Sequence, residues 1–474
     1  PPAGADGMGD PYFPQLGNGG YDAQHYTIDL SVDVARNNVT GTTTMQARAT
    51  QDLSSLNLDF RNFDIDRITV NGKDATFSRK DGELTVVPAS ALASGEDFSV
   101  AVTYHGKPVP WPSAGAPADV GWKKYNDGIC VDCEPDGASS WIPVNDHPRD
   151  KATYSFNIDV PSKYTVVANG QLVAQENHED RTRYSWQARD AMASYLAMIQ
   201  IGDFVRKDEV GPNGLPIRNY FPPRMAKAGE YDFGRTGEMI SLFSSQFGPY
   251  PFEAYGATVV PKSNVGGALE CQTMSVFDPF VVTGDRYYEN VVAHELTHQW
   301  FGDHVSPTNW KDIWLNEGFA SYGEWLWQEK TQGAASVDST AREVYGWLGN
   351  RAQAGVAAST PPESVRKMEA AHWHHLEQST QGGIKIGEPP PSDLFNQEVY
   401  LKGALVLYAL RKEVGDDAFF NGLRTYVAEK GGGNAEIADF RSVMERTSGK
   451  PLEGFFDKWL YQTELPPFPG AAAK

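Results

Sequence analysis

Apolar and polar positions alternate along the first part of the chain, from Tyr21 to about Lys107. The runs YTIDLSVDV, TGTTTMQARAT and LTVVPAS put side chains of opposite character on opposite faces, and turn residues such as Asn71 and Gly72 separate successive runs. A period of two residues is typical of strands with one face in a core and the other in solvent. The pattern therefore predicts an antiparallel β domain at this end of the chain.

Helical periodicity takes over beyond about Val210. Apolar residues recur at helical spacing in Met225 to Phe247, in Tyr287 to Trp300 behind a possible N-cap at Asp285, and from Val399 onward. Together the two patterns predict an α+β multidomain protein. The predicted divisions are a flexible, Pro- and Gly-rich N-terminal segment (1–20), the β domain (21–208) and a mainly helical domain (209–474).

Composition narrows the classes of partner. The chain has 474 residues, of which 41 are basic and 61 acidic, so its formal charge is −20. This charge disfavours nucleic acid and anionic membranes as partners, and no apolar run is long enough to span a bilayer. The chain begins without Met and without a signal-like segment, so we expect a secreted or extracytoplasmic protein whose leader has been removed. The sequence does not reveal the oligomeric state.

The segment VVAHELTHQWFGD contains the spacing of a hydrolytic metal site. His294 and His298 lie four residues apart, so on a helix both can present a ring nitrogen to one Zn²⁺. Glu295 is the neighbouring carboxylate that can accept a proton from water, and Glu317, after a gap of 18 residues, is the candidate third ligand. Three protein ligands leave a tetrahedral zinc one open position, which indicates catalysis.

A second carboxylate follows Glu317 on the same predicted helix. Glu324 lies seven residues later, two turns along one face. Histidines that bind a metal usually donate their other ring N–H to a carboxylate or carbonyl, so Glu324 is a candidate support for a ligand. An ordinary surface glutamate is the alternative.

HELTHQWFGD together with NEGFASY resembles the zinc aminopeptidases of the aminopeptidase N and leukotriene hydrolase type, which belong to the gluzincin metallopeptidases. The resemblance extends from about Tyr21 to Leu465. It implies that the helical domain is a thermolysin-like catalytic domain with one Zn²⁺, and that the substrates are peptides with a free N-terminus.

The upstream run NVGGALECQT is similar to the glycine-rich exopeptidase motif of that family. The resemblance implies that Gly266, Gly267 and Ala268 bind the substrate backbone and that Glu270 binds its α-ammonium group. Leu269 and Cys271 depart from the usual motif, which changes the packing around the first substrate residue. A glycine-rich edge strand with a solvated glutamate is the alternative.

Two more residues match functional positions of the family. Glu134, in CEPDGASSWIPV, corresponds to a second anchor for the amine, and Tyr400, in VYLKGA, corresponds to the tyrosine that donates a hydrogen bond to the oxyanion. The alternatives are a surface turn residue before Pro135 and an interior helix aromatic.

Three other functions compete with the aminopeptidase. A thermolysin-like endopeptidase would share the metal site, and an inactive peptide-binding scaffold would share the fold, although the intact Glu295 argues against it. Epoxide hydrolysis, an activity of one branch of the family, is disfavoured because the chain ends before the helical domain that follows in many relatives.

The remaining sequence signals concern cysteine and histidine. In the family the two amine-binding carboxylates converge, so Cys271 is expected to form a disulfide with Cys133 or Cys130, and a local Cys130–Cys133 bridge is the equal alternative. Residues 351–398 have the Pro and Gly density of a long peripheral loop. The histidines in this loop lack a carboxylate partner at helical spacing and predict surface residues instead of a second metal site; they are His372, His374 and His375.

Overall fold

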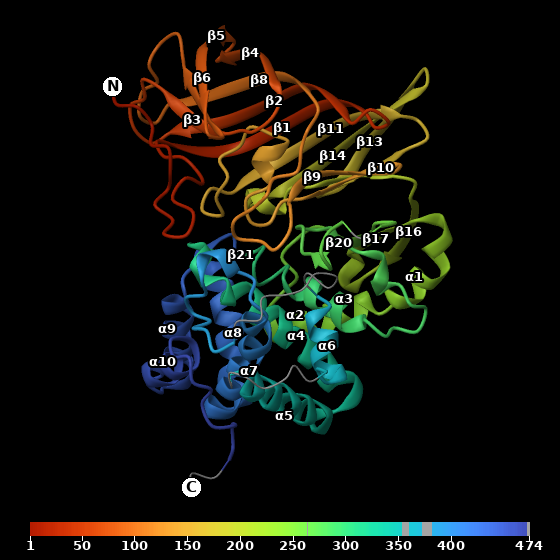
Figure 1. The fold of residues 1–474 in the computed structure, drawn as a ribbon, viewed down its shortest axis with the longest axis vertical. Coiled ribbons are helices and arrows are strands. Elements are labelled where there is room, and N and C mark those ends of the chain that lie inside the picture. Colours follow the sequence, from red (N-terminus) through yellow and green to blue (C-terminus); the bar gives the residue numbers. More distant parts are fainter. Residues whose placement is uncertain (263, 353–359, 372–381, 472–474) are drawn as a thin grey trace.

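The computed structural model describes residues 1–262, 264–352, 360–371 and 382–471. A β domain lies above a helical domain, with the N-terminus in the first and the C-terminus at the far end of the second (Figure 1). The predicted α+β architecture is confirmed. Within the described part of the chain, no helix is long and apolar enough to cross a membrane.

Three sheets build the β domain. The large sheet has the order β13 (Gln171–His178), β14 (Arg181–Met192), β11 (Ala152–Pro161), β1 (Tyr21–Asp33), β2 (Asn38–Ala49), β8 (Asp97–Gly106), β4 (Asp64–Val70) and β5 (Lys73–Asp74). The second sheet has the order β12 (Thr165–Ala168), β15 (Ile199–Gly202), β10 (Gly128–Asp132) and β9 (Gly121–Tyr125). The third sheet has the order β3 (Leu56–Asp59), β7 (Glu83–Val87) and β6 (Thr76–Lys80).

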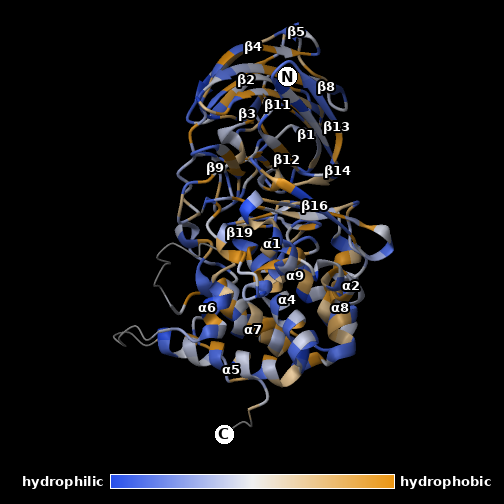
Figure 2. Ribbon diagram, turned by 90° about the vertical axis from the view of Figure 1, so that its right-hand side faces the viewer, coloured by the Kyte–Doolittle hydropathy of each residue, from blue (hydrophilic) through white to orange (hydrophobic). Residues whose placement is uncertain are grey.

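The alternating pattern of the sequence matches the burial of these strands. In β11 every second side chain is buried, and hydrophilic and hydrophobic residues alternate along the strands in Figure 2. The predicted antiparallel pairing has one exception, because β1 runs antiparallel to β2 but parallel to β11. The pattern of side chains predicts which face of a strand is buried. It does not predict whether a neighbouring strand from a distant part of the sequence runs parallel or antiparallel.

The first twenty residues are not a free tail. Gly4 donates its backbone N–H to Ser55, and the Asp10 carboxylate accepts from the buried His147 of the β domain at 2.8 Å. The same carboxylate accepts the backbone N–H of Trp310 at 3.0 Å. Because Trp310 belongs to the helical domain, this segment links the two domains.

A mixed five-stranded sheet opens the helical domain. Its order is β16 (Val205–Val210), β17 (Pro216–Phe221), β18 (Tyr255–Val259), β20 (Ser275–Phe277) and β19 (Ala268–Leu269), and a small parallel pair joins β21 (Val305–Pro307) to β22 (Gly433–Ala435). The helices are α1 (Ala226–Asp232), α2 (Thr236–Phe247), α3 (Glu289–Thr297), α4 (Trp314–Gln332), α5 (Ala334–Arg351), α6 (Glu363–Glu369), α7 (Gln397–Val414), α8 (Asp416–Lys430), α9 (Ile437–Ser448) and α10 (Glu453–Leu460). Helix α4 packs against both α3 and α7 at the centre of this domain.

The helix of the histidine motif is shorter than the periodicity predicts. It begins at Glu289, and the Asp285 carboxylate accepts the N–H of Tyr287 in the preceding turn instead of capping the helix. His298 comes directly after the last helical residue but keeps helical backbone angles. The face shared with His294 is therefore preserved.

Candidate active site

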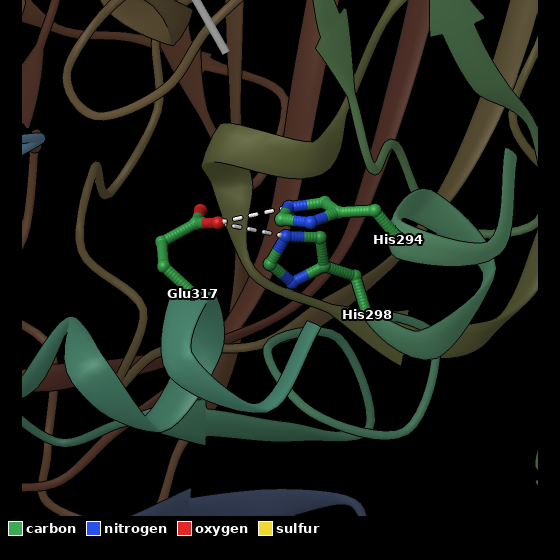
Figure 3. A group of neighbouring side chains, drawn as sticks. All are labelled: His294, His298 and Glu317. Atoms are coloured by element: carbon green, nitrogen blue, oxygen red, sulfur yellow. Dashed lines mark hydrogen bonds and ion pairs between the residues drawn. The ribbon is translucent and has the colours of Figure 1, made fainter. Parts of the chain in front are cut away.

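Helices α3 and α4 bring together the three predicted zinc ligands. The Nε2 atoms of His294 and His298 each lie 3.1 Å from the same oxygen, Oε2 of Glu317 (Figure 3). The two rings are steeply inclined, with centroids 4.8 Å apart, so both Nε2 atoms point to one place. Two imidazoles and a carboxylate at such separations fit a single Zn²⁺.

Hydrogen bonds on the far side of each ring fix the orientation of these histidines. His294 donates from Nδ1 to Oε2 of Glu324 at 2.9 Å, and Asn290 donates to the other oxygen of that carboxylate at 2.6 Å. His298 donates from Nδ1 to the carbonyl of Phe301 at 3.0 Å. Both rings consequently expose Nε2 to the metal position. Glu324 is buried behind a ligand, and the surface alternative is wrong.

Replacing Glu324 with Ala is expected to weaken zinc binding about 10- to 100-fold, because the His294 ring loses the partner that orients it. Competition with a chelator measures the affinity. The change Lys330→Ala, at an exposed position on the same helix, is the matched control and should leave the affinity unchanged. Equal zinc affinity in both variants would contradict this role for Glu324.

Three further carboxylates surround the ligands. Glu134 comes from the loop after β10, Glu270 follows β19, and Glu295 lies on α3; all three are buried. Their ligating atoms fall into groups no more than 4.8 Å across with His298 or Glu317, and Oε2 of Glu270 lies 3.9 Å from Nε2 of His298. The predicted convergence of Glu134 and Glu270 from different domains is therefore present.

These carboxylates leave several buried oxygen atoms without a hydrogen-bond partner within the described residues. They include both oxygens of Glu134, Oε1 of Glu270 and Oε2 of Glu295. Burial raises the pKa of all three groups above the ordinary value for glutamate. A buried carboxylate is stabilised by a positive charge beside it. This cluster of carboxylates is therefore suited to cations, both a metal ion and an ammonium group.

Tyr400, on α7, lies beside the same carboxylates. Its ring stacks against that of His294, with centroids 5.9 Å apart and an interplanar angle of 15°. Burial raises the pKa of its phenol well above the ordinary value, so at neutral pH the group keeps its proton and can donate a hydrogen bond.

The glycine-rich segment is held by a carboxylate that the sequence analysis missed. Asp278 accepts four backbone N–H groups at 2.8 to 3.0 Å, those of residues 264, 265, 266 and 267. In the β19 and β20 hairpin, Ala268 pairs with Phe277, which brings Asp278 opposite Gly267. From the sequence, Asp278 could have been linked to the glycines only by predicting this hairpin.

The predicted disulfides are wrong. Cys130, Cys133 and Cys271 are buried free thiols. Cys130 lies in β10 and Cys133 directly after it, and residues three apart in extended chain are separated by about 10 Å, beyond the reach of a disulfide. Burial raises the pKa of all three thiols well above the ordinary value, so little of the reactive thiolate is present. The histidines His372, His374 and His375 lie outside the described residues.

Comparison with known proteins decides the family. Residues 22–196 match the Peptidase M1 N-terminal domain, and residues 231–459 match the Peptidase family M1 domain. The chain belongs to the M1 peptidase family. The predicted family, fold class and zinc cofactor are thereby confirmed. The prediction of a zinc metallo-aminopeptidase is confirmed at the level of the family.

Several relatives resemble this M1 peptidase over much of its length. Leukotriene A-4 hydrolase of Xenopus laevis is 25% identical, and the match covers 94% of this chain and 72% of the relative. Glutamyl aminopeptidase of Homo sapiens is 26% identical, and the match covers 71% of this chain but 34% of the relative. An M1 zinc metallopeptidase from Deinococcus radiodurans is 28% identical, with a TM-score of 0.81 over 98% of this chain and 99% of its own. A mutant of the Deinococcus enzyme binds a Tyr-Ser-Ala substrate and has a TM-score of 0.82.

Proposed function

We propose that this M1 peptidase removes the N-terminal residue from peptides with a free amino group. The observation that supports this most directly is the cluster of buried carboxylates beside the metal ligands. Glu134 and Glu270 each have a carboxylate oxygen within 4.8 Å of one of Glu317, and within the described residues both have oxygens without a hydrogen-bond partner. Such a pair recognises a substrate ammonium at a short distance from the bond to be cleaved, which restricts cleavage to the first peptide bond.

His294, His298 and Glu317 are the residues that hold the zinc ion. When bound, zinc polarises the carbonyl of the scissile bond and makes water more acidic. Glu295 is the general base: its buried carboxylate accepts a proton from the attacking water and then returns it to the leaving amine.

Tyr400 and the glycine-rich strand position the reacting amide. Tyr400 donates its phenolic hydrogen to the oxyanion that develops on the carbonyl. Strand β19 is at the edge of its sheet, so an extended peptide can pair with it, and Gly266, Gly267 and Ala268 let the two backbones approach closely.

Two alternatives are distinguished by one experiment. An endopeptidase would accept peptides with blocked N-termini, and an inactive scaffold would cleave nothing. We expect rapid release from fluorogenic aminoacyl substrates, loss of activity with a chelator, recovery on adding zinc, and little cleavage of the N-acetylated counterparts. Equal cleavage of the acetylated substrates would overturn the aminopeptidase assignment in favour of the endopeptidase.

Removing the charge of one anchor is expected to weaken substrate binding. In Glu134→Gln or Glu270→Gln a charge-assisted contact worth about 1.5–3 kcal/mol is lost, so KM for free-amine substrates should rise roughly 10- to 100-fold. Steady-state kinetics measure the effect. The residual activity on N-acetylated substrates serves as the control, because these lack the ammonium group and should respond little. Unchanged KM values in both variants would remove the anchors from the proposed function.

We also propose, from the sequence alone, an extracytoplasmic location. Fractionation of the source cells, followed by detection of the protein with an antibody, tests it. Recovery in the cytosolic fraction would contradict the proposal.

A further inference from the structure

The turn that follows Glu270 has a residue in an unfavourable backbone conformation. The N–H of Met274 donates to the carbonyl of Cys271 at 3.0 Å, which closes a β-turn between β19 and β20. At the third position of this turn Thr273 has a φ of +68°. Turns with a positive φ there normally use glycine, and for a β-branched residue such a value is an outlier that persists only where the surroundings enforce it.

Hydrogen bonds from three parts of the molecule enforce the conformation of Thr273. Its N–H donates to Oε1 of Gln299 at 2.9 Å, and its carbonyl accepts from Arg218 at 3.0 Å. Its hydroxyl oxygen accepts the N–H of Gly170 at 2.7 Å. Gln299 is the residue after His298, Arg218 lies in β17, and Gly170 belongs to the β domain. The turn is therefore hydrogen-bonded to the residue that follows the zinc ligand His298, to strand β17 and to the β domain.

The same network reaches the backbone of Glu270. Gln299 donates from Nε2 to the carbonyl of Glu270 at 3.3 Å while its Oε1 holds Thr273. Oε1 of the Glu270 carboxylate has no hydrogen-bond partner within the described residues, and Oε2 lies 3.9 Å from Nε2 of His298, too far for a hydrogen bond. The place of this carboxylate consequently depends on how its backbone is held.

We propose that Thr273 and Gln299 are positioning residues that set the distance between the Glu270 carboxylate and the metal ligands, and thereby determine how well the site accepts a substrate ammonium. This inference rests on the proposed function, in which Glu270 binds that ammonium. Gln299 fixes the turn relative to His298, and Thr273 extends the same support to the β domain, which also supplies Glu134.

A pair of inhibitors isolates the contact with the amine. Leucine hydroxamate and its des-amino counterpart both offer a hydroxamate to zinc, but only the first has an α-ammonium group. The ratio of their inhibition constants therefore reports on ammonium recognition, separately from zinc binding and from catalysis. In the wild-type enzyme we expect a preference of about 10- to 100-fold for leucine hydroxamate, the value of a charge-assisted contact.

Two variants test the positioning role. Thr273→Val keeps the shape but loses the hydroxyl, and Gln299→Leu removes both amide contacts. Each is expected to lower the inhibitor preference about tenfold and to raise KM for aminoacyl substrates by a similar factor, with unchanged zinc content and a smaller change in kcat. If Thr273→Val fails to fold, Gln299→Leu decides alone, because it leaves the residues of the turn in place.

Two matched variants serve as controls. Thr273→Ser retains the hydroxyl and should keep the preference. Gln272→Leu removes amide contacts from the neighbouring position to the carbonyls of Asp190 and Ala191, without touching Glu270, and should also keep it. An unchanged preference in both test variants, or an equal loss in Gln272→Leu, would overturn the positioning role. A wild-type enzyme with no preference would instead overturn the amine recognition in the proposed function.

Discussion

Replacement of Glu295 with Gln is expected to leave zinc bound and to abolish nearly all hydrolysis. The amide has almost the same shape as the carboxylate, so the buried side chain can keep its place and the ligands His294 and His298 are untouched. It cannot accept the proton that the attacking water must lose. General base catalysis typically contributes about 100- to 10,000-fold, and kcat should fall by that order.

The measurement is kcat on an aminoacyl substrate together with zinc content by atomic spectroscopy. Glu413→Gln makes the same chemical change at an exposed position of α7 and should leave both values unchanged. Full activity of the Glu295 variant with zinc bound would refute the general-base role.

Tyr400→Phe has the second largest expected effect. The ring that stacks on His294 remains, so the packing around that ligand is kept, while the O–H donor is lost. Removing one donor to a developing oxyanion costs about 100- to 1000-fold in kcat. KM should change much less, because the contact strengthens only as negative charge develops on the carbonyl oxygen.

Tyr408→Phe is the matched control. Tyr408 lies two turns further along α7 than Tyr400, and the change removes a hydroxyl that donates a hydrogen bond to Asp338 of α5. Its kcat should stay close to that of the wild type. If kcat of the Tyr400 variant is also unchanged, the interior-aromatic alternative holds for Tyr400.

Local geometry explains which features could be predicted from the sequence. The spacing of His294 and His298 places both on one helical face whatever the rest of the fold does, and Glu324 follows Glu317 by two turns for the same reason. The strands of the β domain were predicted because their period of two reflects burial on one face. The ends of α3 were not predicted correctly, because the ends of a helix depend on which of the neighbouring turn residues find hydrogen-bond partners.

Contacts between distant segments explain what could not be predicted from periodicity or spacing. Resemblance to the family suggested that Glu134 and Glu270 converge, but no spacing between them indicates it. The local Cys130–Cys133 bridge was mispredicted because the extended chain of β10 separates the two residues. The bridge to Cys271 was mispredicted because closeness of the neighbouring carboxylates does not by itself give the geometry of a disulfide.

By itself, the sequence determined the motif on which the predicted chemistry rests, two histidines at zinc-binding spacing with a glutamate between them, and it determined the acidic charge and the α+β order of elements. These follow from helix and strand periodicity, which act over a few residues. Only the tertiary structure decided that Asp278 holds the glycine-rich segment and that Thr273 and Gln299 support Glu270. Those contacts join residues from separate elements and two domains, and they form only when the chain is packed.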